Sequence, residues 1–129
     1  MENNEGVNLL MIEYEENVNV VAKINTELCK MYGLEHYLTE FSSNLINALN
    51  QYKRFVMLMQ NRKKFVEGLL DFSNACIEFF EQNKDEKKSS HDAIVLKMNN
   101  LIKTMNVIND EINNNFADSV KEYIEKWFI

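Results

Sequence analysis

Apolar residues recur at steps of three or four along more than half of the chain. This spacing places them on one face of an α-helix, which has about 3.6 residues per turn. The first stripe consists of Val18, Val21, Ile24, Leu28, Met31, Leu34, Leu38, Phe41, Leu45, Leu49, Tyr52, Val56, Met59, Val66, Leu69 and Phe72. It predicts one long helix over about residues 13–80, with Gly33 as a candidate bend.

A polar segment separates this stripe from a second one. Residues 81–90, EQNKDEKKSS, contain no apolar side chain, which is typical of a solvated loop. Ser89 followed by Asp92 resembles a capping box and predicts the start of the next helix. We therefore expect a loop at about 81–90 and a second helix over about 91–129.

The second helix carries the most regular heptad pattern in the chain. Its apolar positions alternate steps of four and three, as in a coiled coil: Ile94, Met98, Leu101, Met105, Ile108 and Ile112. The stripe then continues mainly at steps of four, through Phe116, Val120, Ile124 and Trp127. This stutter predicts a bend or a change of partner near residues 113–115.

These stripes predict the fold class. Two long helices joined by one loop form an antiparallel hairpin or an elongated coiled-coil bundle. The sequence has no proline and only 3 glycines, whereas an antiparallel sheet of this size needs frequent turn residues. We therefore expect an all-α chain, with residues 1–129 forming a single, incomplete domain.

The segment from Gln60 to Cys76 joins a basic triplet to a dense apolar stripe that contains Gly68. Glycine within a helix costs about 1 kcal/mol relative to alanine, so we expect another helix to approach closely there. Such a stripe is most often ordinary core. However, a hairpin of two helices cannot cover all of its aromatic residues. We therefore predict a dimer seam formed by Phe65, Val66, Gly68, Leu69 and Phe72.

Charge and cysteine content narrow the function classes. A net charge of -6 argues against general nucleic-acid binding, which needs a basic surface. Cys29 and Cys76 lack the spacing of metal ligands, so we expect buried, reduced thiols. No apolar run approaches the roughly 18 residues of a transmembrane helix. The simplest prediction is a cytoplasmic protein.

The sequence carries no pattern of catalytic residues. His36 and His91 are isolated from each other and from the cysteines, and no glycine-rich phosphate loop is present. We therefore expect no enzymatic activity, no metal and no cofactor.

Five basic residues in the first helix are candidates for phosphate contacts: Lys53, Arg54, Arg62, Lys63 and Lys64. On one helix, Lys53 and Lys64 fall within about 20° of each other, while Arg62 lies on the far side. An ordinary solvated surface and a patch for anionic lipid both fit this distribution.

Two stretches resemble the BAR domains of centaurin-type Arf GTPase-activating proteins and oligophrenin-type Rho GTPase-activating proteins. The first runs from Asn61 to Phe72, NRKKFVEGLLDF, and is similar to an asparagine and FVxG core in the family's first helix. The second runs from Phe116 to Tyr123, FADSVKEY, and is similar to a stretch of the second helix. The resemblance covers the chain from Val18 onward.

This resemblance implies a homodimer with a curved helical bundle, whose positive face meets anionic phospholipid at curved membranes, as in vesicle trafficking and endocytosis. The five basic residues are then the candidate lipid contacts, and the protein is peripheral at membranes. The chain departs from the family in its negative net charge and in ending before a third helix. The alternative is a helical adaptor that binds a protein partner through its apolar seam, without lipid.

Overall fold

The chain folds into helices that lie side by side. The computed structural model describes residues 4–59, 61–84 and 90–128, with side-chain surroundings for 6–56, 58–59, 61–84 and 90–115. Within this part the helices are α1 (Asn4–Tyr32), α2 (Tyr37–Phe55), the 3-10 turn η1 (Val56–Leu58), α3 (Arg62–Asn83) and α4 (His91–Phe128). These described residues include no strand, and the all-α class is confirmed.

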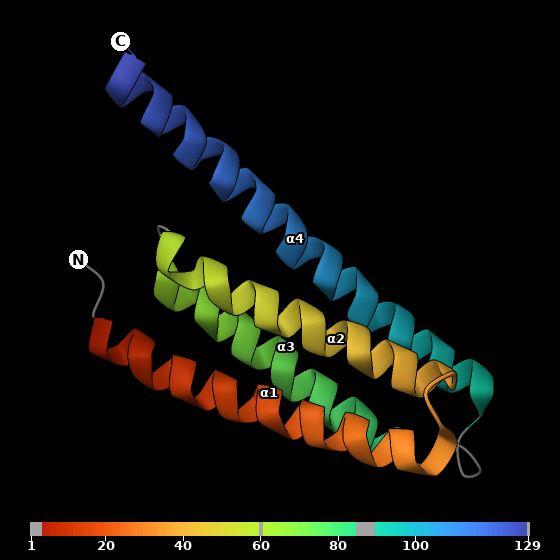
Figure 1. Ribbon diagram of the computed structural model, residues 1–129. Helices are drawn as coiled ribbons and strands as arrows, with labels where there is room; N and C mark the ends of the chain where they lie inside the picture. The colour runs from red at the N-terminus through yellow and green to blue at the C-terminus, as the bar shows by residue number, and fades with distance from the viewer. Residues whose placement is uncertain (1–3, 60, 85–89, 129) are drawn as a thin grey trace.

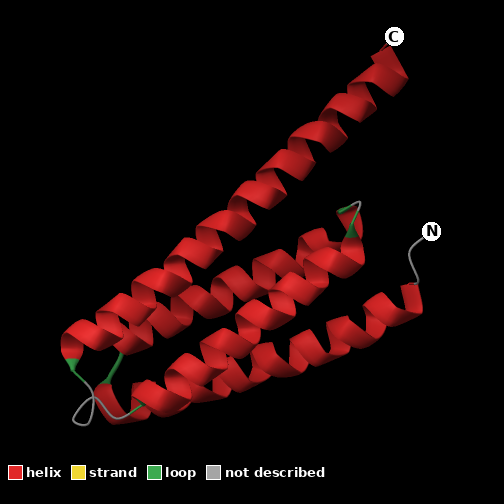
Figure 2. Cartoon of the chain, turned by 180° about the vertical axis from the view of Figure 1, so that it is seen from behind, coloured by secondary structure: helices red, strands yellow, loops and turns green. Residues whose placement is uncertain are grey.

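Consecutive helices run in opposite directions (Figure 1). α1 packs mainly against α3 and α2, whereas α4 packs less extensively, against α3 and α2. The first part of α4 lies along the bundle, and its C-terminal end stands clear of the other three helices in both views (Figures 1 and 2). α4 nevertheless continues without a break through residues 113–115.

The predicted single helix over residues 13–80 is wrong, because the chain reverses direction near Gly33. This glycine has φ 85°, in the left-handed region that a residue with a Cβ rarely adopts. Its N–H donates to the Cys29 carbonyl at 2.9 Å and closes the end of α1. α2 then starts with a cap in which His36 Nδ1 accepts from the Leu38 N–H at 3.2 Å.

A second reversal separates α2 from α3. The backbone tightens into η1 after Phe55, and Met59 is extended, with ψ 142°. Val56 and Met59 are nevertheless both buried. The apolar stripe therefore continues through the reversal, which explains why the sequence pattern shows no break there.

The start of α4 differs slightly from the predicted capping box. Ser89 lies outside the described residues, and Ser90 is the residue that caps the helix. Its Oγ accepts from the Ala93 N–H at 3.5 Å, and its carbonyl accepts from the Ile94 N–H at 3.1 Å. α4 begins at His91.

Apolar side chains from all four helices form one continuous core. Aromatic rings join α2 to α3, where Phe41 contacts Phe79 edge to face at a centroid distance of 5.8 Å. Most positions of the predicted stripe are buried. Met31 and Leu34 are exceptions, 55% and 79% exposed, because they lie at the reversal where α1 ends.

Hydrogen bonds from side chains tie α1, α2 and α4 together across the core. The buried Tyr14 hydroxyl of α1 donates to the Leu49 carbonyl of α2 at 2.6 Å. The Tyr52 hydroxyl of α2 donates to Asn109 Oδ1 of α4 at 2.9 Å. Since a polar group without a partner is costly inside a core, these bonds favour one register of the helices.

Both cysteines are free. Cys29 is half-buried in α1 and Cys76 is buried in α3. Burial raises the pKa of the Cys76 thiol to about 12, so this thiol stays protonated at neutral pH. A protonated, buried thiol is a poor nucleophile.

Replacing Tyr14 by phenylalanine should lower the free energy of unfolding by about 1 kcal/mol or more, because the Leu49 carbonyl loses a buried donor. Tyr32→Phe is the matched control, since its hydroxyl donates to the Lys84 carbonyl at an exposed site. That variant should cost less than about 0.5 kcal/mol. Urea denaturation followed by circular dichroism measures both, and equal losses would contradict the role of the Tyr14 bond.

Candidate partner-binding groove

A groove runs along the seam between α3 and α4. Its first hollow is lined by Lys64, Phe65, Gly68, Leu69, Thr104, Val107, Ile108 and Glu111. Its second hollow is lined by Ala75, Glu78, Phe79, Gln82, Lys97, Asn100, Leu101 and Thr104. Because Thr104 borders both hollows, we treat them as one feature, the α3–α4 groove.

Each hollow taken alone is smaller than a typical small-molecule site. Their volumes are about 270 and 240 Å³, below the range of about 300 to 1,000 Å³ that is common for small-molecule sites. Both are bordered by buried apolar residues, which include Phe65, Leu69, Phe79, Leu101 and Ile108. At the edge of the first hollow, Val107 is 65% exposed.

Small residues on α3 keep the groove open. Gly68 and Ala75 are both exposed and lie seven residues apart, two helical turns along the same face. A Cβ placed on Gly68 would meet no atom within 4 Å. The predicted close approach of another helix at Gly68 is therefore wrong within this chain, because α4 leaves open space there.

Four charged residues border the groove, and their order reverses between its two ends. At the first hollow the cation Lys64 belongs to α3 and the anion Glu111 to α4. At the second hollow the anion Glu78 belongs to α3 and the cation Lys97 to α4. Within the described part of the chain, none of these four side chains forms a salt bridge.

The predicted dimer seam is divided between the core and the groove. Phe65, Val66, Leu69 and Phe72 are buried within the single chain, whereas Gly68 is exposed. A hairpin of only two helices could not cover these rings. In the structure, the additional helices produced by the two reversals cover them.

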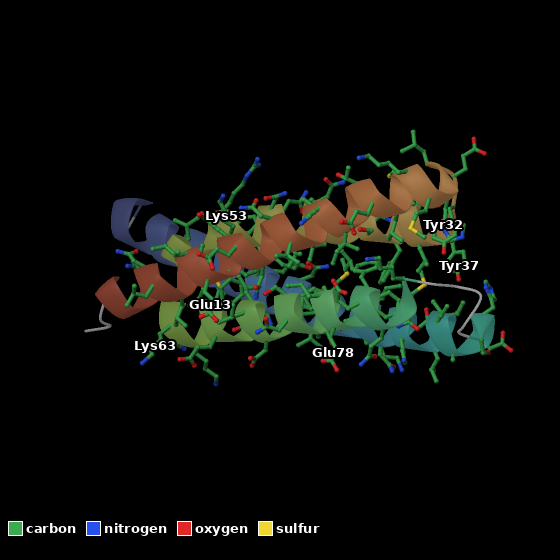
Figure 3. All side chains as sticks on the ribbon, turned by 90° about the horizontal axis from the view of Figure 1, so that it is seen from below. Glu13, Tyr32, Tyr37, Lys53, Lys63 and Glu78 are labelled. Carbon is green, nitrogen blue, oxygen red and sulfur yellow. The ribbon has the colours of Figure 1, made fainter. Side chains whose placement is uncertain are left out.

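The α2–α3 connection gathers the five predicted lipid-binding residues at one end of the bundle. Lys53 and Arg54 lie in the last turn of α2, and the triplet 62–64 opens α3. Lys53 Nζ lies 3.3 Å from Glu15 Oε1. Lys53 and Lys63 project from opposite sides of the bundle, so the five residues do not share one face (Figure 3).

The two histidines lie at the opposite end and are not isolated from each other. Tyr37 stacks on His36 at a centroid distance of 4.7 Å and meets His91 edge to face at 5.1 Å. Figure 3 shows Tyr32 and Tyr37 close together at this end. No sequence pattern indicated this group, because its members come together only through the reversal at Gly33 and the position of the start of α4.

The α4 side of the groove is also absent from the predicted site. Thr104 and Val107 fall between the heptad positions of the second stripe, and such positions are ordinarily solvent-facing. Small residues seven apart on α3 were an available sign of an open helix face. The divergence of α4, in contrast, has no local sequence marker.

No family model, curated protein or solved structure matches this chain. The resemblance to BAR domains stays a prediction, and the side chains of its second stretch, residues 116–123, lie outside those that the structure describes. Among the described helices, none combines the length and apolarity needed to cross a membrane.

The two internal glycines should respond in opposite ways to alanine. Gly68→Ala should raise the free energy of unfolding by up to about 1 kcal/mol, because alanine favours the helix and its Cβ meets open space. Gly33→Ala should lower it by about 1 to 2 kcal/mol, because φ 85° is strained for alanine. Urea titrations at low protein concentration measure both changes, and destabilisation by Gly68→Ala would show that the site at Gly68 is not open.

Proposed function

We propose that this chain is a non-catalytic interaction module whose α3–α4 groove accepts an α-helix of a protein partner. The observation that carries the proposal is the open groove itself, with apolar lining and small residues at Gly68 and Ala75. Helix-in-groove recognition uses an amphipathic helix that places its apolar face in such a channel.

The spacing of the hollows indicates what the partner helix presents. Gly68 and Ala75 are seven residues apart, which corresponds to about 10.5 Å along the helix axis. A partner helix that lies nearly parallel to α3 reaches both hollows with side chains at positions i and i+7, of which an apolar one suits the first hollow beside Gly68. Charged residues on its flanks then meet the rim residues Lys64, Glu78, Lys97 and Glu111.

Site-specific photo-crosslinking tests this groove. The photo-crosslinker p-benzoylphenylalanine replaces Ala75, and the chain is produced in the cells in which it naturally occurs. Irradiation should then give one discrete covalent adduct. Gly68→Leu in the same chain should abolish the adduct, because leucine fills the first hollow. The matched control carries the crosslinker at Asn47, which is exposed on α2 and outside the groove.

The Asn47 position should give no such adduct. An adduct from Ala75 that survives Gly68→Leu, or an equal adduct from Asn47, would contradict binding in the groove. No adduct from Ala75 under any condition would remove the proposed function.

We propose anionic phospholipid as a second candidate partner, bound at the α2–α3 end of the bundle. The observation that favours it is that all five basic residues lie at the same end of the bundle as Leu58, which is 59% exposed. An exposed leucine at a basic end suits the boundary between headgroups and acyl chains, and each Lys or Arg near an anionic surface contributes about 1 kcal/mol. The resemblance to BAR domains supports the same partner.

Liposome co-sedimentation tests the second candidate. The chain should bind phosphatidylserine or phosphoinositide vesicles at low salt and should dissociate as salt increases. Reversing Lys53, Lys63 and Lys64 to glutamate should abolish binding. The control reverses three other exposed lysines, Lys23, Lys30 and Lys103, which changes the net charge equally.

Loss of binding in both triple variants would mean that only overall charge matters and would remove the α2–α3 end as a lipid site. Gly68→Leu should leave vesicle binding unchanged, so the lipid candidate and the groove are tested independently.

A further inference from the structure

We propose that the helix-bearing partner in the α3–α4 groove is a second copy of this chain, packed face to face about a two-fold axis that runs along the groove. This inference rests on the proposed function, since it names the occupant of the same groove. Three features support it: the signs of the rim charges, the position of Asp71, and the exposed side chains that the contact would cover.

The rim charges are self-complementary. In a face-to-face pair related by an axis along the groove, α3 of one copy lies over α4 of the other at the same height. Lys64 therefore meets the partner's Glu111, and Glu78 meets the partner's Lys97. Because the charges on the α3 and α4 sides of the groove are opposite at each end, every one of these contacts joins opposite charges, which favours this pairing over random partners.

Asp71 selects this axis over the alternative. An axis across the groove would also pair opposite rim charges, since it brings Lys64 to the partner's Glu78. However, the exposed Asp71 lies seven residues from each of them, so the two copies of Asp71 would meet at that axis and repel. With the axis along the groove, Asp71 faces the partner's Thr104, whose side chain is neutral, so the two copies of Asp71 lie apart.

The packing of the two copies also follows a known pattern. α3 and α4 run in opposite directions (Figure 1). The two copies would therefore form a four-helix bundle in which each helix is antiparallel to both of its neighbours, as in many four-helix bundles. The two grooves would join into one shared interior. That interior would cover Gly68, Ala75 and Val107, which are exposed in the single chain.

Sedimentation equilibrium of the full 129-residue chain tests the proposal. We expect a dimer with a dissociation constant below about 100 µM. Lys64→Glu should raise that constant by about tenfold or more. The reason is that the new glutamate at position 64 of each copy then faces the partner's Glu111, so two repulsive pairs form in the dimer. The double variant Lys64→Glu with Glu111→Lys restores opposite charges and should return the constant to within about threefold of the original.

The matched control is Lys23→Glu, the same charge change at an exposed residue of α1, away from the groove. It should leave dimerisation unchanged. An equal effect of Lys23→Glu would show that net charge rather than the rim pairs is responsible, and would overturn the proposal. Further weakening in the double variant would overturn the proposed axis, since only an axis across the groove sets those two reversed residues against like charges.

A chain that stays monomeric at about 100 µM would overturn the second copy as occupant. The crosslinker at Ala75 separates this failure from failure of the groove. An adduct of twice the mass of the chain supports the second copy, and an adduct with a different protein leaves the groove function standing while excluding self-association. A monomer without any adduct removes both.

Discussion

The left-handed backbone at Gly33 is the constraint on which the rest of the structure depends. A continuous helix through this point would extend away from the core, whereas the reversal folds α2 back along α1. The Thr39 hydroxyl lies 2.7 Å from the His36 carbonyl and 3.0 Å from the Gly33 carbonyl, so a side chain of α2 contacts the backbone of the reversal directly. Only after this turn can α3 return beside α1 and complete a three-helix core.

The unequal packing of the four helices explains why the groove lies between α3 and α4. α1, α2 and α3 cover one another's apolar faces, and α4 is added to a core that is largely complete. Its first half is held by Ile94, Leu101 and Ile108, whose side chains are buried. The C-terminal end of α4 extends past the start of α3 and stands clear of the other helices (Figure 1). The hollows lie along that first half, beside Leu101 and Ile108, where the small residues Gly68 and Ala75 of α3 leave space.

Sequence periodicity identified the core more reliably than it identified the path of the chain. Val21, Leu28, Leu45 and Leu49 were expected on the apolar stripe and are buried. The stripe could not reveal the reversals, because a helical repeat of three and four continues through a turn whose flanking residues, such as Val56 and Met59, remain in the core. Glycine and proline are the local markers of a reversal, and the second reversal contains neither. The groove was also missed, since it depends on how two helices diverge rather than on either helix alone.

The burial of the aromatic stripe changes which residues are available for recognition. Phe65 and Phe72 are used in the core of the single chain, so an interface built on them would require α3 to leave the bundle. What α3 offers to a partner is instead the strip beside them, where Gly68 and Ala75 are too small to reach α4. Recognition at such a strip depends on the shape and charge of the incoming helix, because the apolar rings on either side already have their partners. Gly68, which was predicted to lie in a dimer seam together with these rings, is thus the one member of that set at which the structure leaves room for an external contact.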